Sequence, residues 1–391
     1  MPFLALRATY GLTGNAPAPG TVASQDILNA QTSGFLQGGS GLQILTPANR
    51  QLTWESTKTT NLGLDFAVLQ SRINGSIDLY YKKTTDLLGN VPTNSFTGYS
   101  TIVGNLGDLE NKGIELSLNS VNIRTNSFRW STSINMAYNK NKLTRLSLNA
   151  PVTTGAGRVN QQYVEGFPAF AVFAYDFAGL DALGDPRIAL ADGTVTKALN
   201  AAGVGDVKYM GTYQPVWSGG ISNVFTYKQF SLSANAVLNL GHVIRRDVNR
   251  YFTGRLTHTT NTFTTGNVHE DFASRWRQQG DELNTNIPSF VSNTALSDSR
   301  RNLNYYILGD DNVVSASYIK MRDITLAYSL PNLITSKLGV QQVTLRAQLS
   351  NVMLWKANDF DIDPEFQNAP FGIRTMLLNQ GTVSFGLNVK F

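Results

Sequence analysis

Residues 381–391 read GTVSFGLNVKF, and this run of eleven residues decides the fold. From its second position on, polar or small side chains alternate strictly with apolar ones (Thr382, Ser384, Gly386, Asn388 and Lys390 against Val383, Phe385, Leu387, Val389 and Phe391). Successive side chains of a strand point to opposite sides, so the run predicts a strand with one polar and one apolar face. Its length is what a tilted strand needs to cross a bilayer.

The same alternation recurs along the whole chain. Nine further segments show it, at residues 4–10, 62–68, 73–81, 114–118, 128–138, 221–227, 230–240, 324–330 and 343–349. The connections between them alternate between short and long, with long ones at about residues 88–113, 139–216 and 241–312. Tight periplasmic turns and long extracellular loops alternate in this way in outer-membrane barrels. We therefore predict an all-β chain whose strands, about ten of them, form a transmembrane antiparallel β-barrel.

A soluble sandwich is the alternative, because it gives the same alternation with its apolar face packed inward. Three features favour the barrel: the strand length, the unequal loops, and aromatic residues near strand ends where the membrane interface lies. These aromatic residues are Tyr10, Tyr81, Tyr138, Tyr227 and Phe391.

Composition excludes several classes of protein. The chain has 391 residues and 42% hydrophobic residues, yet no apolar run approaches the ~18 residues of a membrane-spanning helix. With no cysteine, it has no disulfide framework, thiol nucleophile or cysteine-ligated zinc site. A net charge of +5 is spread along the chain without a basic stripe, so we predict no nucleic-acid binding. The start at Met1 lacks a signal peptide, which for an exported protein indicates a fragment or a start further upstream.

One segment conflicts with the alternation. Lys320 and Arg322 share the parity of Ile324, Leu326 and Tyr328, so a regular strand would direct both cations at lipid. An arginine at the bilayer midplane costs about 2–4 kcal/mol, and almost nothing at the interface. Either these residues lie at or above the headgroups, or a β-bulge switches the face of the strand.

Seven ordered motifs closely resemble the SusC/RagA family of TonB-dependent outer-membrane transporters, and the likeness covers essentially the whole chain. They are LRATYGLTGN (6–15), NLGLDF (61–66), GSIDLYYKKTTDLL (75–88), NLGDLENKGIEL (105–116), YNKNK (138–142), ASYIKMRDI (316–324) and DIDPE (361–365).

This resemblance implies a barrel of about 22 strands in the outer membrane, plugged by an N-terminal domain. It also implies a SusD-like surface lipoprotein as lid, energy from the TonB system, and oligosaccharides or peptides as cargo. Phe391 would be the signal that the barrel-assembly machinery reads. Signal peptide, TonB box and plug are absent, so residues 1–391 would be the C-terminal portion of the barrel.

Candidate sites are few. Asp359, Asp361, Asp363 and Glu365 place carboxylates at a spacing that could hold Ca²⁺, although we favour a turn closed by Pro364. The histidines (His242, His258 and His269) lack a zincin motif, and we expect them to be solvated in loops. Loop aromatics (Tyr305, Tyr306 and Phe371) could stack on cargo or pack among the loops.

The leading function is therefore TonB-linked solute uptake across the outer membrane, with no cofactor and no catalytic residue. The residues that bind cargo are not assigned. Two alternatives stay open. One is a small outer-membrane barrel hydrolase, which would need His and acidic or Ser residues converging above the rim. The other is a surface-binding module or remnant that does not transport.

Overall fold

The structure, a computed structural model, describes residues 2–17, 25–32, 40–92, 96, 98–99, 101–147, 151–161, 163–254, 268–367, 375–377 and 381–391. The chain divides into two compact units. Unit 1 comprises residues 1–116, 138–151 and 163–169, and unit 2 comprises residues 117–137, 152–162 and 170–391.

The ten predicted strands are confirmed, and they follow one another in the order β1-β4-β5-β6-β7-β13-β14-β17-β18-β21. Each element that interrupts this numbering lies in a long connection. The ten strands are β1 (Phe3–Asn15), β4 (Glu55–Val68), β5 (Ile73–Pro92), β6 (Thr101–Arg124), β7 (Phe128–Leu146), β13 (Trp217–Tyr227), β14 (Phe230–Leu240), β17 (Tyr318–Ser329), β18 (Gln342–Lys356) and β21 (Thr382–Lys390).

In unit 1, β4 pairs antiparallel with both β1 and β5. A short turn joins β4 to β5, and three of its residues in succession have left-handed backbone angles (Leu69, Gln70 and Ser71). The opposite ends of β1 and β4 are joined by a long connection that contains the hairpin β2 (Ile27–Thr32) and β3 (Ser40–Thr46).

Several strands are longer than the alternation predicts, mainly toward the long loops. The predicted loop at residues 88–113 is mostly strand, because β5 runs to Pro92 and β6 begins at Thr101. Likewise β7 continues to Leu146, into the predicted excursion. The physical reason is that backbone pairing needs no apolar side chains, whereas the alternation marks only the part of each strand that faces lipid.

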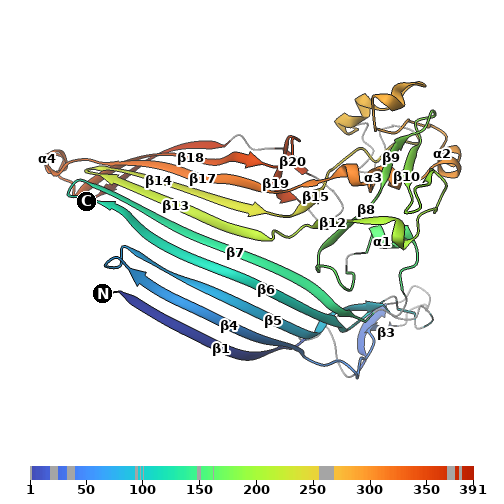
Figure 1. The fold of residues 1–391 in the computed structure, drawn as a ribbon, viewed down its shortest axis with the longest axis horizontal. Helices are drawn as coiled ribbons and strands as arrows, with labels where there is room; N and C mark the ends of the chain where they lie inside the picture. Colours follow the sequence, from blue (N-terminus) through green and yellow to red (C-terminus); the bar gives the residue numbers. More distant parts are fainter. Residues whose placement is uncertain are drawn as a thin grey trace. The chain divides into compact units, whose positions relative to one another are not determined.

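In unit 2, β13, β14, β17, β18 and β21 pair antiparallel in that order. The strands β13, β14, β17 and β18 can be followed side by side in Figure 1. A two-residue turn at Lys228 and Gln229 joins β13 to β14, and α4 (Asn332–Thr335) lies in the short connection from β17 to β18. Long connections follow β14 and β18, as the alternation predicts.

The apolar face of these strands is exposed. Side chains at the predicted outward positions include Leu62 at 50% exposure, Leu326 at 46% and Phe385 at 83%. Within the described strands the apolar face therefore does not form the core that a sandwich would build between two sheets. Such a face suits a lipid environment, and this favours the barrel over the sandwich. None of the described helices is long and apolar enough to cross a membrane.

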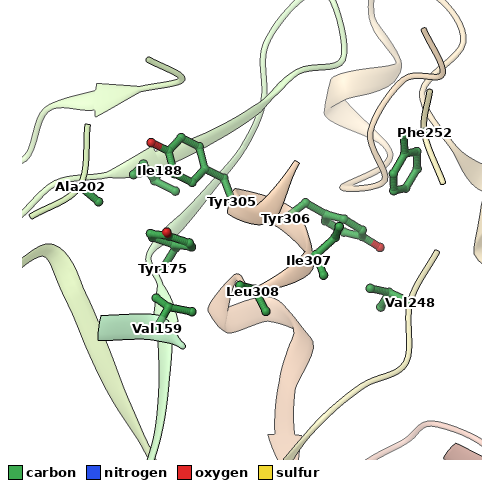
Figure 2. Close-up of a cluster of buried hydrophobic side chains, with 10 residues drawn as sticks. All are labelled: Val159, Tyr175, Ile188, Ala202, Val248, Phe252, Tyr305, Tyr306, Ile307 and Leu308. Carbon is green, nitrogen blue, oxygen red and sulfur yellow. The ribbon is translucent and has the colours of Figure 1, made fainter. Parts of the chain in front are cut away.

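The buried core of unit 2 lies in its loops. Ten buried side chains form it: Val159, Tyr175, Ile188, Ala202, Val248, Phe252, Tyr305, Tyr306, Ile307 and Leu308 (Figure 2). Short elements supply or frame them: α1 (Gly155–Val159), β8 (Ala171–Tyr175), β9 (Phe177–Leu180), β10 (Pro186–Ala189), β11 (Val195–Thr196), β12 (Val207–Thr212), β15 (Val243–Arg245), α2 (Thr294–Arg300), α3 (Asn304–Ile307) and β16 (Val313–Ser315). We call this part of unit 2, residues 152–161, 170–216, 241–254 and 268–315, the loop assembly.

Candidate functional site

A bulge in β17 resolves the conflict at Lys320 and Arg322. Against β14, Asp323 pairs with Asn235 but Met321 pairs with Ala236, so Arg322 is the extra residue. The bulge exchanges the two faces of β17 at this point. Met321 then takes the outward position, and Lys320 turns to the polar side, where it is only 1% exposed. Of the two explanations that the sequence leaves open, the bulge is correct.

The inward turn of Lys320 lets it meet the acidic motif at residues 361–365. Its ammonium lies 2.7 Å from Asp363 Oδ2 and 2.9 Å from Glu365 Oε2. The Arg322 guanidinium donates through both Nη atoms to the two oxygens of Glu365. Arg322 and Lys320 lower the pKa of the Glu365 carboxyl, mainly through these hydrogen bonds. The motif therefore fastens β19 (Ile362–Gln367) to β17. We call the ten paired strands, of which β17 is one, the wall.

The four acidic residues of the predicted calcium site do not share one centre. Asp363 and Glu365 are engaged by the two cations of β17, whereas Asp359 and Asp361 are exposed. Among the described residues no group of three or more His, Asp or Glu side chains could hold a metal ion. The predicted turn closed by Pro364 is wrong, because Pro364 lies inside β19, and the Asp363 and Glu365 carboxylates on either side of it are bound to Lys320 and Arg322.

Ion pairs recur on the polar face of the strands. In unit 1, Arg7 binds Asp65 at 2.5 Å and lies 3.3 Å from Asp78. Further toward the loops in the same unit, Arg145 bridges two acids, Asp108 at 2.9 Å and Asp86 at 3.1 Å. Cross-strand register could have revealed the first cluster, because Arg7 pairs with Gly63, which in turn pairs with Asp78. The second could not be found in this way, because Asp86 has a left-handed backbone and breaks the alternation.

In unit 2 the polar face carries amides and hydroxyls. Ser222 and Asn235 pair on this face, whereas Asn223, which accepts from Trp130 Nε1 at 3.0 Å and from the Thr132 hydroxyl at 2.7 Å, pairs with Ala234 on the apolar face. Asn235 donates to Asp323, and Asn239 donates to the Tyr318 hydroxyl. A face of satisfied amides, hydroxyls and paired charges is hydrophilic without a strong net charge.

The loop aromatics Tyr305 and Tyr306 are core residues, 1% and 2% exposed. The Tyr305 ring packs edge-on against Tyr175 at 5.0 Å, and its hydroxyl donates to Ala198 O at 2.7 Å. Figure 2 shows both rings inside the loop assembly. Of the two roles that the sequence allows, packing is confirmed for these two residues, and Phe371 lies outside the described residues.

The two described histidines have separate surroundings, and His258 lies outside the described residues. His242 is buried near the Tyr318 ring, and burial lowers its pKa to about 4, so it is neutral at pH 7. His269 accepts a hydrogen bond from the backbone N of Asp271, while its contact with that residue's carboxylate raises the histidine pKa. The expectation of solvated histidines is wrong for His242. Neither setting pairs the histidine with a hydroxyl nucleophile.

A buried charge cluster holds the loop assembly, and the sequence analysis missed it. Asp185, 0% exposed, accepts from Arg300 at 2.7 Å and from Lys197 at 3.0 Å. Arg301 lies 3.6 Å away and donates to the backbone carbonyls of Ser289 and Phe252. Arg300 lies 115 residues from Asp185 in the sequence, so the Gly-Asp-Pro turn at residues 184–186 is the only local feature that draws attention to Asp185.

Phe391 follows directly after β21 and is 84% exposed. Its side chain lies free of the core, as recognition by another protein requires. Its role as an assembly signal stays a prediction.

In the comparison with known proteins, the family model and the curated relatives that match are all TonB-dependent receptors. A family described as TonB dependent receptor-like, beta-barrel, matches residues 1–241. TonB-dependent receptor P26 of Formosa agariphila is 29% identical over 425 residues, which cover 99% of this chain and 40% of the receptor. TonB-dependent receptor SusC of Bacteroides thetaiotaomicron is 27% identical over 360 residues, covering 84% of this chain and 32% of SusC.

The solved structures agree on the fold. The structure of the RagAB peptide transporter superposes with a TM-score of 0.74 at 20% identity, covering 99% of this chain and 41% of the matched chain. Its 'closed-closed' state gives a TM-score of 0.75 at 21% identity. This chain thus spans about 40% of the length of the first curated relatives that it matches.

Proposed function

The chain belongs to the TonB-dependent receptor-like β-barrel family, and from this membership we propose that it serves TonB-linked solute uptake as part of a SusC/RagA-type transporter. It is an integral β-barrel protein of the outer membrane. The observation that carries the proposal is the division of its strands into an exposed apolar face and a polar face of satisfied groups. A wall between lipid and a water-filled passage requires this division.

We propose that these ten strands are the C-terminal portion of a barrel of about 22 strands. The share of the relatives that the chain covers supports this size. The pairing gives further support, because β1 pairs with β4 and β21 with β18 on one side each. Each of these two strands has a second edge that a closed barrel would pair with another strand.

For the cargo we propose uncharged or zwitterionic solutes, in the range of oligosaccharides or short peptides. The charges of the polar face support this, because they are neutralised in pairs such as Arg7 with Asp65 and Arg145 with Asp108. A solute of strong single charge would meet no complementary field on this face. RagAB, whose structure superposes on this chain, is a peptide transporter, which fits the peptide option.

The partners follow from the same proposal. A SusD-like surface lipoprotein would cover the end at which the long loops lie, and the TonB system would deliver energy through the remainder of the transporter. The loop assembly supports a docking role, because its buried core and its Asp185 cluster give it a fixed surface. We propose no enzymatic activity, since the relatives are named as receptors and the described histidines are placed for packing and capping.

Uptake by cells tests the proposal. Cells that express the complete transporter containing this chain would be given fluorescent oligosaccharides or fluorescent oligopeptides, with and without a functional TonB protein. We expect TonB-dependent accumulation of one cargo class. Absence of TonB-dependent accumulation of either class would contradict the proposal.

Heat-modifiable gel migration of the isolated chain separates the transporter portion from the small barrel hydrolase. A chain that needs further strands should show no heat-sensitive band in detergent by itself. A heat-sensitive band would mean that the ten strands close alone, which favours the small barrel.

A further inference from the structure

The outward face of unit 1 carries a band of lysines directly above its aromatic residues. Tyr10 pairs with Thr60, and Thr60 pairs with Tyr81, so the two tyrosines lie at one level across β1, β4 and β5. Two residues further toward the long loops, Leu12 pairs with Lys58 and Lys58 pairs with Lys83. Lys58 shares the parity of the exposed Leu62, and Lys83 shares that of Leu79, so both cations lie on the lipid side.

The band continues on β6 and β7. Lys112 shares the outward parity of Ile114, its side chain is 66% exposed, and its ammonium lies 5.1 Å from the centre of the Tyr81 ring. On β7, Asn139 binds the inward Tyr80 hydroxyl, so Tyr138 and Lys140 take the outward side. Lys142 follows Lys140 at the same parity, and both are exposed.

The acids beside this band are already occupied. Asp108 binds Arg145 at 2.9 Å, and Glu110 accepts a hydrogen bond from the Tyr81 hydroxyl and lies 3.7 Å from Lys112. Within the described residues, Lys58, Lys140 and Lys142 make no ion pair, and Lys83 has only a longer-range attraction to Asp108, which Arg145 already binds. Like charges directly opposite each other, as in Lys58 and Lys83, destabilise a strand pair unless an anion lies between them. The band therefore has a positive charge that the described protein does not neutralise.

A groove of about 480 Å³ lies beside this band. Tyr81, Lys112, Ile114 and Tyr138 line it from the outward side. Behind the groove, on the inward side, the Tyr80 ring packs over Gly113, where a Cβ would lie 2.3 Å from the ring and 2.5 Å from Tyr138 O. The outward face thus has apolar side chains below the groove, two aromatic rings at its level and ammonium groups above it. A phospholipid has the matching order, with acyl chains, then glycerol or sugar, then phosphate.

We propose that this lysine band, Lys58, Lys83, Lys112, Lys140 and Lys142, binds the phosphate groups of an anionic lipid in the outer leaflet of the outer membrane, with the lipid seated in the groove at Tyr81 and Tyr138. The outer leaflet is assigned because the band lies on the side of the long loops, which face outward in such barrels. The band is confined to unit 1 strands, since β13 and β14 contain no lysine. The site depends on the membrane location and not on transport, so a transport-deficient barrel would still bind the lipid.

Native mass spectrometry of the barrel containing this chain, released from detergent, would test the site with bisphosphorylated lipid A. The same lipid without its phosphates serves as the comparison ligand. Each lysine near a charged lipid surface contributes about fivefold to binding, so the triple variant Lys58→Gln, Lys83→Gln, Lys112→Gln should bind about 100-fold more weakly.

The matched control removes the same charge at the opposite ends of the strands, with Lys228→Gln, Lys337→Gln and Lys390→Gln. It should bind as the unaltered barrel does, and both variants should keep heat-modifiable migration, which reports correct folding. The proposal is overturned if the lipid without phosphates binds equally well, or if the control loses as much affinity as the band variant. Binding of inorganic phosphate alone with the affinity of the lipid would assign the band to a free anion and would also overturn it.

Discussion

The wall strands and the loop assembly of unit 2 place their apolar side chains in opposite positions, exposed in the wall and buried in the loop assembly. In the wall, Leu326 and Phe385 are exposed, and polar groups such as Asn235 and Asp323 lie on the other face. In the loop assembly, Phe252 is 0% exposed and Asp185 is buried among cations. The wall is thus built for a solvent that is itself apolar, whereas the loop assembly has the core of an ordinary water-soluble domain. A substitution of the same chemical kind should therefore have different consequences in the two regions.

The largest effect is expected for Phe252→Ala in the loop assembly. The ring packs against Tyr306 and is fully buried, so its removal should leave a cavity and cost about 3–5 kcal/mol of local stability. Hydrogen exchange of the amides of residues 170–254 would measure it. An unchanged exchange rate would contradict the view that this region has a water-type core.

The next effect is a pH dependence of the stability of the loop assembly. Burial lowers the pKa of His242 to about 4 from its ordinary 6.5. Below pH 6.5 the His242 imidazole is protonated in the unfolded chain, whereas in the folded chain it stays neutral down to about pH 4. The free energy of unfolding therefore falls as the pH is lowered from 6.5 to 4. The loss should reach about 3 kcal/mol by pH 4.

Thermal unfolding between pH 7 and pH 4 would measure this loss. The variant His242→Gln should show a flatter profile, while His269→Gln should not, because the pKa of His269 is raised. Identical profiles for His242→Gln and the unaltered protein would rule out this role for the buried imidazole.

An intermediate effect is expected in the wall for Ile324→Arg. Ile324 shares the outward face and pairs with Ala234 and Leu349 in the middle of the wall. A cation facing lipid near the midplane costs about 2–4 kcal/mol. Folding titrations into lipid vesicles would measure it, with Thr325→Arg on the polar face as control. Equal costs at the two positions would contradict the assignment of the two faces.

The smallest effect is expected for Leu349→Ala, also on the outward face and 37% exposed. Lipid chains can fill the space that the lost side chain leaves, so the cost should stay below about 1 kcal/mol, in contrast to the cavity at Phe252. The same vesicle titration measures it. A cost as large as that of Phe252→Ala would remove the distinction between wall and loop assembly.

The same contrast explains what the sequence could predict. Side chains such as Val383, Phe385 and Leu387 alternate because lipid and water lie on opposite sides of the wall, so a local pattern carries the whole signal. All ten strands were predictable for this reason, together with the family. The extra length of β5, β6 and β7 was not, because strands above the bilayer need no apolar face.

The loop assembly gave no comparable signal. Asp185 and Arg300 are more than a hundred residues apart in the sequence, and His242 and Tyr318 are dozens of residues apart. No local sequence pattern therefore predicts either contact. The acidic motif at residues 361–365 shows that local spacing alone does not identify the partners of a side chain. Its carboxylates have a spacing that suits calcium, but the partners of Asp363 and Glu365 are Lys320 and Arg322, which face them only because of the bulge.

That bulge has a consequence for how related walls can differ in length. A one-residue insertion in a regular strand would move every later side chain from water to lipid. At Arg322 the extra residue stands outside the pairing with β14, so the strand on either side keeps its facing whether this residue is present or lost. Loss of this residue would therefore keep the pairing with β14, would leave Asn351 as an extra residue on β18, and would remove the hydrogen bonds from Arg322 to Glu365.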